Sequence, residues 1–443
     1  MNWESIMYRL KFVVLTLIVN LGFAQHMLSP EEAISLALEN NYGIKVATNN
    51  VELAENNKDV LNSGYLPVLS GSASATYNRD NITAEFNNGE TTSLNGAESN
   101  RYNAALNLNY TLFDGLGRLY NYKQLKEEYN LSELEARQTI ELTIVQLLSI
   151  YYDISRRSEN VSSLEQTLSI SKERLTRAEY QFEYGQNTKL DVLNAEVDIN
   201  NDSISIINAR QNLINAKRDL TVVTGNTISE VFEIDTTVTF LDGLDKEMLL
   251  IRTLNNNVSL LQAEQNIRIN EFSLKASKSG YLPAVGLFGT YGWNENNNNA
   301  ASFVAVSTNT GISGGINLTW NLFDGGSTIT RVKNSKLLLE NQKLLKEDLI
   351  LNITRDFNNA WTDYQNKLNI FYIQNDNIRT AKNNFERTEE QFRLGQVTSI
   401  VFRQAQQNLL LAELNRNQAK YDAKLAEVLV LQLSGELLNV NIF

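Results

Sequence analysis

The five residues SGYLP occupy positions 63–67, and the same five letters return at positions 279–283. The chain has only three prolines, and two of them, Pro67 and Pro283, stand in this repeated word. Proline lacks the N–H that a helix interior needs, and it disfavours helix in the residue before it. Each copy of the word therefore predicts the end of a helix and the start of an extended segment.

Other words repeat at nearly the same spacing. LFDG at 112–115 returns at 322–325, and QFEYGQNT at 181–188 returns as QFRLGQVT at 391–398, both at an offset of 210. SGYLP is offset by 216, so a length difference of six residues falls between the first two words, as expected of a loop. The chain thus predicts two copies of one unit: repeats at 25–226 and 245–443, joined by a linker at 227–244.

Alternating residues between the repeated words predict strands. YNAALNLNYTLF (102–113) alternates apolar and polar residues, and GISGGINLTWNLF (311–323) repeats the parity, with Trp320 equivalent to Tyr110. The segments after the two prolines alternate more weakly, and asparagine-rich stretches separate the members of each pair. We therefore expect one β-hairpin with a long polar loop in each copy, at about 66–113 and 282–323.

Most of the remaining sequence predicts helix. SPEE at 29–32 is a capping box with proline at the first helical position, and it opens a predicted helix toward Asn62. From Arg118 to Tyr184 the chain has neither proline nor glycine, and its apolar residues recur at steps typical of coiled-coil helices. Gly185 and Gly395 interrupt this pattern, and a second helix is expected to run back from each.

Particular residues mark each predicted change between helix and strand. Each LFDG word places an aspartate where the next helix begins, which suits a helix cap, and the following glycine permits a bend. The predicted transition residues are Pro67, Asp114, Gly115, Pro283, Asp324 and Gly325.

The N-terminus predicts a secretory signal peptide over residues 1–24, read from Met1 or from Met7. Arg9 and Lys11 form a basic region, an apolar stretch of about a dozen residues follows, and small residues precede a cleavage point after Ala24. The alternative is a membrane anchor, but the apolar run is too short to span a bilayer of about 30 Å.

Composition excludes several classes of function. A formal net charge of −12 without any basic block argues against nucleic-acid binding. The chain has no cysteine and one histidine, His26, so it offers no thiolate or histidine-cluster metal site and no catalytic constellation. We expect neither an enzyme nor a bound cofactor or metal.

The predicted strands favour an outer-membrane barrel. A soluble antiparallel sheet would also alternate, but a signal peptide and helices too long for a globular domain favour the membrane. Open strand edges are not tolerated in lipid, and single-chain barrels begin at eight strands, so four strands per chain require oligomerisation. The predicted aromatic belt that contacts membrane lipid comprises Tyr77, Tyr102, Tyr110, Trp293 and Trp320.

The mature chain resembles, over essentially its whole length, the TolC-type outer membrane efflux proteins. The resemblance is carried by SPEEAISLALENN (29–41), the paired SGYLP and LFDG words, and YQFEYGQNTKLDVLNAE (180–196) with its partner EQFRLGQVTSIVFRQAQ (390–406). It implies an α+β membrane protein whose long antiparallel helices form a periplasmic α-barrel. It also implies a homotrimer whose 12 strands, four per chain, form one outer-membrane β-barrel.

The resemblance further implies a passive exit duct of a tripartite efflux or type I secretion system. Its periplasmic tip would meet a periplasmic adaptor (membrane fusion) protein and an inner-membrane pump or ABC exporter. On this chain the tip falls at two turns, whose residues are Gly185, Gln186, Thr188, Gly395, Gln396 and Thr398.

Tips in this family are often narrowed by carboxylates and ion pairs just after the turns. Asp191 holds that position in the first copy, but its equivalent, Val401, is not acidic, so a full acidic ring is not implied. Asp191 also suits a simple role at a helix start. The candidate gate residues are Asp191, Gln404 and the apolar pair Phe392 and Phe402.

Two other functions compete with the duct. A trimeric adhesin also combines four strands per chain with long coiled coils, but it would keep its strands together at the C-terminus. Here the two predicted hairpins lie about 210 residues apart. An extracytoplasmic enzyme is disfavoured because no catalytic site is found. The sequence predicts neither the cargo nor the class of pump.

Overall fold

The computed structural model describes residues 27–228 and 232–439, so the predicted signal peptide and His26 lie outside the described residues. The chain divides into two compact units. Within the described residues, unit 1 comprises 27–49, 134–261 and 348–439, and unit 2 comprises 50–133 and 262–347. Each unit is therefore built from both sequence copies. Among the described helices, none is both long and apolar enough to cross a membrane.

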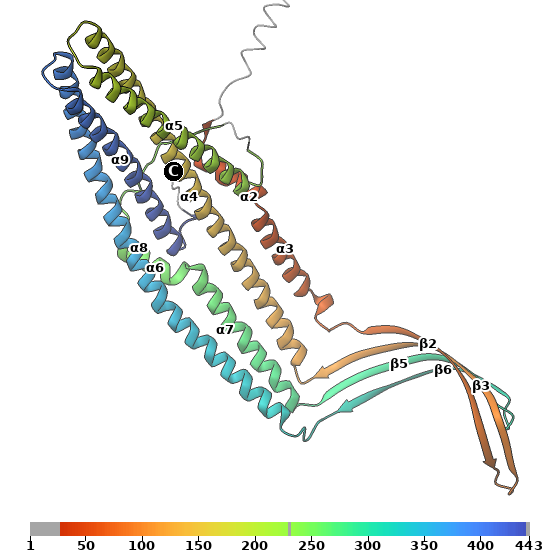
Figure 1. Cartoon of the computed structure of the whole chain (residues 1–443). Helices are drawn as coiled ribbons and strands as arrows, with labels where there is room; N and C mark the ends of the chain where they lie inside the picture. The colour runs from red at the N-terminus through yellow and green to blue at the C-terminus, as the bar shows by residue number, and fades with distance from the viewer. Residues whose placement is uncertain (1–26, 229–231, 440–443) are drawn as a thin grey trace, which may run out of the picture. The chain divides into compact units, whose positions relative to one another are not determined.

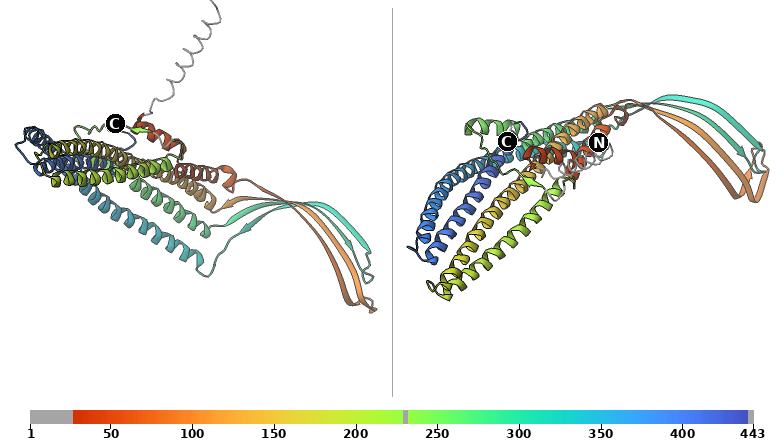
Figure 2. Two further views of the ribbon diagram at one scale, coloured as in Figure 1. Left: turned by 45° about the horizontal axis from the view of Figure 1, so that its top comes forward. Right: turned by 90° about the horizontal axis from the view of Figure 1, so that it is seen from above.

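Two helical hairpins dominate unit 1, although the first parts of their long helices (117–133 and 327–347) belong to unit 2. In the first copy α4 (Gly117–Glu183) is followed by α5 (Lys189–Val223), and in the second α8 (Ser327–Arg393) is followed by α9 (Ser399–Leu433). α4 and α8 have 67 residues each, or about 100 Å of helix. The proline- and glycine-free stretch that predicted α4 agrees with its bounds to within one residue. Both connecting turns lie at the same end of unit 1 (Figures 1 and 2).

A hydrophobic core joins α4, α5 and α9 at the other end of unit 1. α4 contributes Leu147, Leu148, Tyr151 and Ile154, and α5 and α9 contribute further buried residues, among them Leu220, Val428 and Leu431. Burial of such side chains contributes about 1.5–3 kcal/mol each. The hydrophobic steps predicted for the long helix therefore correspond to a packed core here.

The linker between the repeats is bound to this core. Its short strand β4 (Glu233–Ile234) pairs in parallel with β1 (Met27–Leu28). Lys424 is fully buried and donates to the Thr239 carbonyl (2.8 Å) and to Glu427 (2.6 Å). Burial lowers the pKa of Lys424, and the Glu427 carboxylate opposes that shift. The buried Lys424 thus binds a backbone carbonyl of the linker, and its charge is paired with Glu427. The linker is therefore an integral part of unit 1.

The predicted first helix is in fact two helices. α2 (Pro30–Asn40) begins at the capping box, where the Ser29 hydroxyl accepts a hydrogen bond from the Glu32 N–H (3.2 Å). It ends at Asn41, whose backbone is extended, and α3 (Tyr42–Asn57) follows. The expectation of one helix toward Asn62 was wrong because Asn41 caps a new helix: its side-chain oxygen accepts from Gly43 N (2.8 Å).

The second copy breaks at the same place. α6 (Lys246–Asn256) and α7 (Val258–Ser277) are separated by Asn257, whose side-chain oxygen accepts from Ser259 N (3.0 Å). Both asparagines also donate a hydrogen bond across the unit, Asn41 to the Val223 carbonyl and Asn257 to the Leu433 carbonyl, each at 2.9 Å. We call these two arrangements the Asn latches.

Each Asn latch fixes a glycine turn. Gly225 (φ +71°) and Gly435 (φ +69°) end α5 and α9, and a Cβ on either would lie 2.5 Å from the carbonyl oxygen of Asn40 or Asn256. Only glycine fits both the left-handed backbone and this close approach. The latch therefore anchors the C-terminus of each returning helix against the break between two shorter ones.

Unit 2 contains one antiparallel sheet. Its strands are β2 (Val68–Glu85), β3 (Thr91–Asp114), β5 (Ala284–Asn297) and β6 (Val306–Thr319), in the order β2-β3-β5-β6. The two hairpins join through β3 and β5, where Ala104 pairs with Trp293, so both sequence copies form a single sheet with β2 and β6 at its edges. Figure 2 shows the strands running side by side as a twisted ribbon.

Two strand expectations were wrong. The loops expected to be long are short and comprise residues 86–90 and 298–305. Most of the asparagine-rich residues continue the strands, because backbone groups pair regardless of side-chain polarity. In addition, β6 ends at Thr319, so Trp320 lies beyond the strand, with its indole N–H donating to the Tyr281 carbonyl (3.2 Å). Trp320 is thus not the strand equivalent of Tyr110, which lies within β3.

Candidate functional site

The two turns at the end of unit 1 share one geometry, and we call them the tip turns. Gly185 (φ +70°) follows α4 and Gly395 (φ +75°) follows α8. The next residue closes each helix with a backbone hydrogen bond, from Gln186 N to the Gln181 carbonyl (2.7 Å) and from Gln396 N to the Gln391 carbonyl (2.8 Å). This is the Schellman arrangement, which explains why glycine begins both turns.

The helix starts after the tip turns differ. Thr398 accepts a hydrogen bond from Val401 N (3.4 Å), whereas the Thr188 hydroxyl donates to the Asp191 carboxylate (2.7 Å). Gln404 is exposed and donates to Asn408 on its own helix (2.9 Å). Asp191 and Gln404 are therefore each bonded within their own helix start.

The other two candidate gate residues lie together inside the unit. The rings of Phe392 and Phe402 stack with centroids 4.7 Å apart, and Phe385 lies 5.5 Å from Phe402. Phe402 is 3% exposed and forms a small hydrophobic cluster with Phe385 and Ala405. These rings hold α8 and α9 together near the tip rather than presenting a free surface.

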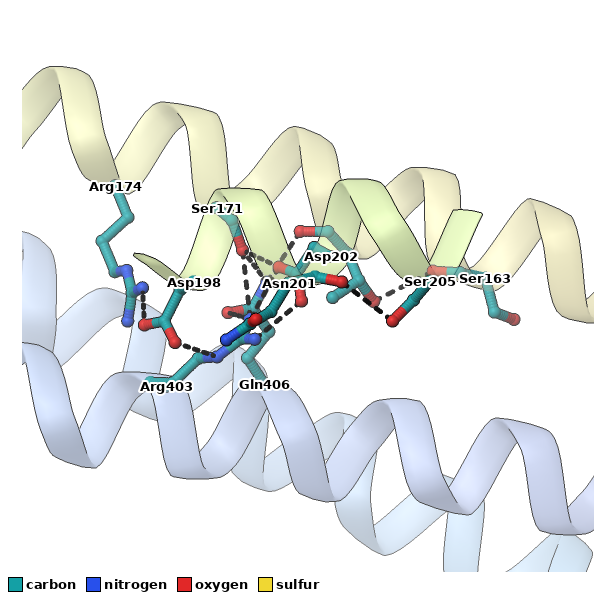
Figure 3. A network of polar contacts seen from close by, with 10 residues as sticks. Ser163, Ser171, Arg174, Asp198, Asn201, Asp202, Ser205, Arg403 and Gln406 are labelled. Atoms are coloured by element: carbon teal, nitrogen blue, oxygen red, sulfur yellow. Dashed lines mark hydrogen bonds and ion pairs between the residues drawn. The ribbon is translucent and has the colours of Figure 1, made fainter. Parts of the chain in front are cut away.

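A polar network that the sequence analysis missed lies beside this cluster (Figure 3). Arg403 on α9 donates two hydrogen bonds to the Asp202 carboxylate on α5, at 2.9 and 2.7 Å. Ser171 on α4 donates to the same carboxylate (2.6 Å). Such bidentate, charge-assisted contacts are among the strongest polar interactions available to side chains.

Three further residues complete this tip network. Gln406 on α9 donates to the Thr167 carbonyl on α4 (2.8 Å), and Arg174 on α4 pairs with Asp198 on α5. Arg403 Nε lies 3.6 Å from Asp198, which links the two ion pairs. We define the tip network as Ser171, Arg174, Asp198, Asp202, Arg403 and Gln406.

Burial makes this network costly to break. The side chains of Arg174, Asp202 and Arg403 are 3%, 10% and 12% exposed. Removing one partner of a buried ion pair costs about 3–5 kcal/mol because the other charge is left uncompensated. The network therefore holds α4, α5 and α9 in a defined arrangement near the tip turns.

A sequence signal for the network exists in retrospect. Asp198 and Asp202 are four residues apart, so they lie on one face of α5. Arg403 stands in the first turns of α9, close in space because both helices begin at the tip turns. The pairing joins residues about 200 positions apart, which periodicity alone does not predict.

In unit 2 the transition residues lie at the base of the sheet. Pro67 immediately precedes β2, and Pro283 immediately precedes β5. Asp114 accepts from Arg118 N and Asp324 from Thr328 N, both at 2.8 Å, at the starts of α4 and α8. Gly115 and Gly325 have φ +69° and +67°. The chain thus turns from strand to helix in the same way twice.

The sheet has one apolar and one polar face. Strand register places four of the predicted belt residues on one face, together with aliphatic side chains; they are Tyr77, Tyr102, Tyr110 and Trp293. On the other face Asn103 donates to Ser74, Asn107 to Ser72, and Thr290 to Asn107, at 3.0–3.3 Å. Among the described residues no cluster of three metal-ligating side chains occurs.

Two features characterise this architecture. One is a four-stranded sheet with an exposed apolar face, and the other is a set of long paired helices with a buried charged network near their turns. The description of the matching family model is outer membrane efflux protein, and it covers residues 33–226 and 249–436, most of the chain. The chain belongs to this family. It is an outer-membrane efflux channel that extends into the periplasm, in a family of channel proteins.

Relatives and solved structures agree with this assignment. The outer membrane protein TolC of Vibrio cholerae is 21% identical over 371 residues, covering 83% of this chain and 84% of TolC. The outer membrane efflux protein BepC of Brucella suis is 21% identical over 408 residues, covering 91% and 85%. The Campylobacter jejuni CmeC outer membrane channel superposes with a TM-score of 0.76 at 19% identity, covering 92% and 86%, which shows the shared fold.

Proposed function

We propose that three copies of this chain assemble into one channel with a 12-stranded barrel. The observation that carries the proposal is the four-stranded sheet with two edge strands, β2 and β6, and an exposed apolar face. Backbone groups at a sheet edge need partners in lipid, and a four-stranded sheet cannot close on itself. Pairing β6 of one copy with β2 of the next satisfies every edge when the ring closes, and the family relationship favours three copies.

The aromatic residues support a membrane position for this sheet. Tyr102 and Tyr110 share a face of β3 and lie eight residues apart, or about 27 Å at about 3.4 Å per residue. Because strands in outer-membrane barrels tilt by about 40°, this separation spans about 20 Å of height, comparable with the apolar band of about 25 Å that aromatic girdles border on both sides. Tyr77 on β2 pairs with Asn100, and Trp293 on β5 pairs with Ala104, so both lie beside Tyr102 and extend one girdle across neighbouring strands.

The helices supply the periplasmic part of the duct in this proposal. Three chains bring together six tip turns of one geometry, a repeated surface for a periplasmic adaptor that links the channel to an inner-membrane pump or exporter. The proposed docking residues are those of the tip turns, Gly185, Gln186, Thr188, Gly395, Gln396 and Thr398. The channel itself is passive in this proposal, and the inner-membrane pump or exporter supplies the energy.

We further propose that the tip network keeps the resting tip narrow. It joins α5 of the first copy to α9 of the second, so widening the tip by separating these helices requires breaking the Arg403–Asp202 contact. Asp191 and Gln404 lie on the same two helices, nearer the turns, and would line the narrowed opening.

Assembly is tested directly by native mass spectrometry of protein extracted from outer membranes in detergent. We expect a stable trimer. A monomer or dimer as the largest species would contradict the 12-stranded barrel. Efflux is tested separately, by comparing drug sensitivity and polypeptide export in a strain lacking the gene with the same strain carrying it. Equal sensitivity to a broad panel of compounds together with equal polypeptide export would contradict a role as an exit duct.

A further inference from the structure

A band without charged residues crosses all four strands of unit 2. Charges are absent from residues 68–78 of β2, 102–113 of β3, 284–294 of β5 and 306–319 of β6. Beyond one border of this band lie Arg79, Arg101 and Glu295, and beyond the other lie the ends of α4, α7 and α8 (Figure 1). In the proposed function the band lies within the membrane, so these helix ends lie at its periplasmic border.

The helix ends at this border are basic, although the whole chain has a net charge of −12. Segments 117–125, 272–281 and 327–339 contain no acidic residue. Their exposed cations form what we call the basic collar: Lys123 on α4, Lys275 on α7, Lys278 on the short helix η2 (Lys278–Tyr281), and Arg331, Lys333 and Lys336 on α8. The next acidic residues along α4, α7 and α8, which are Glu127, Glu271 and Glu340, lie farther from the sheet.

The three parts of the collar adjoin one another, because η2 packs between the starts of α4 and α8. A Cβ built on Gly115 would lie 2.5 Å from the Ser279 carbonyl oxygen. A Cβ built on Gly280 would lie 2.7 Å from the Thr328 hydroxyl oxygen. The collar is therefore one surface of unit 2, although its residues come from both sequence copies.

Two collar lysines lie over one aromatic ring. The ammonium nitrogens of Lys123 and Lys275 are 6.0 Å and 5.1 Å from the centre of the Phe272 ring. Neither lysine forms an ion pair with a described carboxylate, and both are exposed. Neighbouring like charges repel each other, so an anion that binds between these two ammonium groups would be stabilised by both.

The carboxylates closest to the collar along the chain already have partners. Asp114 pairs with Arg118, the half-buried cation of the first segment (3.2 Å). Asp324 accepts from the Thr328 N–H (2.8 Å) and hydroxyl (2.6 Å), and Asp59 caps the short helix that follows it. The six collar cations against the charges of Asp324 and Asp59 leave an excess of four positive charges.

The side chains around the collar are those of a membrane interface. Leu116, Leu282 and Ile329 are exposed beside it, and so is Tyr281. Tyrosine is enriched where membrane and water meet, and lysine and arginine place their methylene groups on apolar surface while the charge stays in water. Exposed aliphatic residues, tyrosine and unpaired cations together favour contact with lipid over contact with water alone.

We propose that the basic collar binds the phosphate groups of anionic phospholipids in the periplasmic leaflet of the outer membrane. This inference rests on the proposed function, because it takes the charge-free band as the membrane-embedded part. Lysine and arginine next to an anionic lipid surface are attracted to it, and salt screens this attraction beyond about 10 Å. Lys123 and Lys275 would hold one phosphate between them above Phe272.

The binding test is native mass spectrometry of the complete channel, extracted in detergent and mixed with phosphatidylglycerol or with phosphatidylcholine of the same acyl chains. Phosphatidylcholine carries the phosphate but no net charge. We expect saturable binding of phosphatidylglycerol to the trimer, at least about tenfold tighter than that of phosphatidylcholine. Equal binding of the two lipids would overturn a site for anionic phospholipid.

Variants assign the binding to the collar. Lys123→Gln combined with Lys275→Gln should weaken phosphatidylglycerol binding at least about tenfold, whereas the same two positions changed to arginine should retain most of it, because the charge remains. The matched control is Lys172→Gln combined with Lys382→Gln, since both lysines are exposed and lie in unit 1. Unchanged binding in the first glutamine pair, or an equal loss in the control, would overturn the collar as the site.

Two further measurements identify the source of the phosphate and the side of the duct wall. Inorganic phosphate in large excess should leave phosphatidylglycerol bound; its displacement would assign the collar to free phosphate and overturn the lipid. Reversal potentials in planar phosphatidylcholine bilayers should be the same for wild type and the Lys123→Gln, Lys275→Gln channel. A loss of anion preference in this variant would place the collar in the lumen and overturn a lipid contact.

The same spectra separate this inference from the proposed function. Absence of a trimer in the wild-type spectra would contradict the proposed function. Trimers that bind phosphatidylglycerol no better than phosphatidylcholine would contradict the collar as a lipid site and leave the trimeric duct standing.

Discussion

The Asn latches and the tip network lie in the same unit, yet the two sequence copies contribute to them in opposite ways. Each copy builds a complete Asn latch: Asn41 with Val223, and Asn257 with Leu433, at the same distance. The tip network is built once, with its aspartates from the first copy and Arg403 from the second.

Equivalent positions show why the network cannot form twice. At the offset of 210, Asp198 and Asp202 correspond to Asn408 and Ala412, and Arg403 corresponds to Leu193. The second copy therefore lacks the acids, and the first copy lacks the matching arginine. Features needed to fold each copy are present in both, whereas the feature that joins the two copies depends on their difference.

The largest expected effect is on an Asn latch. Gly435→Val places a Cβ 2.5 Å from the Asn256 carbonyl oxygen in a left-handed backbone, so we expect a loss of more than about 4 kcal/mol and little folded protein in the outer membrane. The amount of folded trimer is measured by immunoblots of outer-membrane samples that have not been heated. Near-normal abundance would mean that the turn relaxes and that the latch is not rigid.

The second-largest loss of stability is expected from breaking the tip network. Asp202→Asn keeps the shape of the side chain but removes its charge, which leaves the more distant Asp198 as the one described carboxylate that pairs with Arg403; we expect a loss of about 3 kcal/mol. The measurement is thermal unfolding of the detergent-extracted channel, followed by circular dichroism. Asp376→Asn is the control, because its exposed ion pair should contribute almost nothing. Equal effects of the two variants would contradict a stabilising network.

The equivalence of the two latches is tested by Asn41→Ala and Asn257→Ala. Each removes a helix cap and a hydrogen bond across the unit, so we expect a loss of about 2 kcal/mol from either. The same thermal unfolding assay applies, with Asn255→Ala as a control, because Asn255 is exposed and its side chain donates to the Ile251 carbonyl within α6. A loss at one site alone would show that the copies are not equivalent there.

The smallest effect on folding is expected at a tip turn. In Gly395→Val the new side chain meets open space, so only the left-handed backbone (φ +75°) is strained, by about 1–2 kcal/mol. We expect trimer abundance close to normal but reduced efflux, because the turn belongs to the proposed docking surface. Abundance is read from outer-membrane fractions and efflux from drug sensitivity; normal efflux would remove this turn from that surface.

Local signals predicted much of the fold. Two prolines marked where β2 and β5 begin, the first LFDG word marked the end of β3, and a stretch without proline or glycine predicted α4 almost to the residue. The break at Asn41 was missed because its cause is partly distant: the asparagine caps α3 locally but also bonds Val223, 182 residues away. Strand lengths were underestimated because backbone pairing continues through polar residues.

The candidate site was less predictable. The tip turns follow from glycine and its neighbours, which are local. Phe392 and Phe402 are predicted gate residues, and the structure stacks the partly buried Phe392 ring on the buried Phe402 ring. Asp198, Asp202 and Arg174 were missed because each is an unremarkable charge on a long helix. Only the packing of α4, α5 and α9 turns these charges into a network.

The most direct test of a duct closed by a cross-copy network is single-channel conductance in planar lipid bilayers, with wild-type channel and the Asp202→Asn variant compared at neutral pH. We expect a low conductance for the wild-type trimer and a clearly higher one for Asp202→Asn channels that native mass spectrometry shows to be trimeric. Equal conductance of the two trimers would contradict the claim that the Arg403–Asp202 contact holds the resting tip narrow.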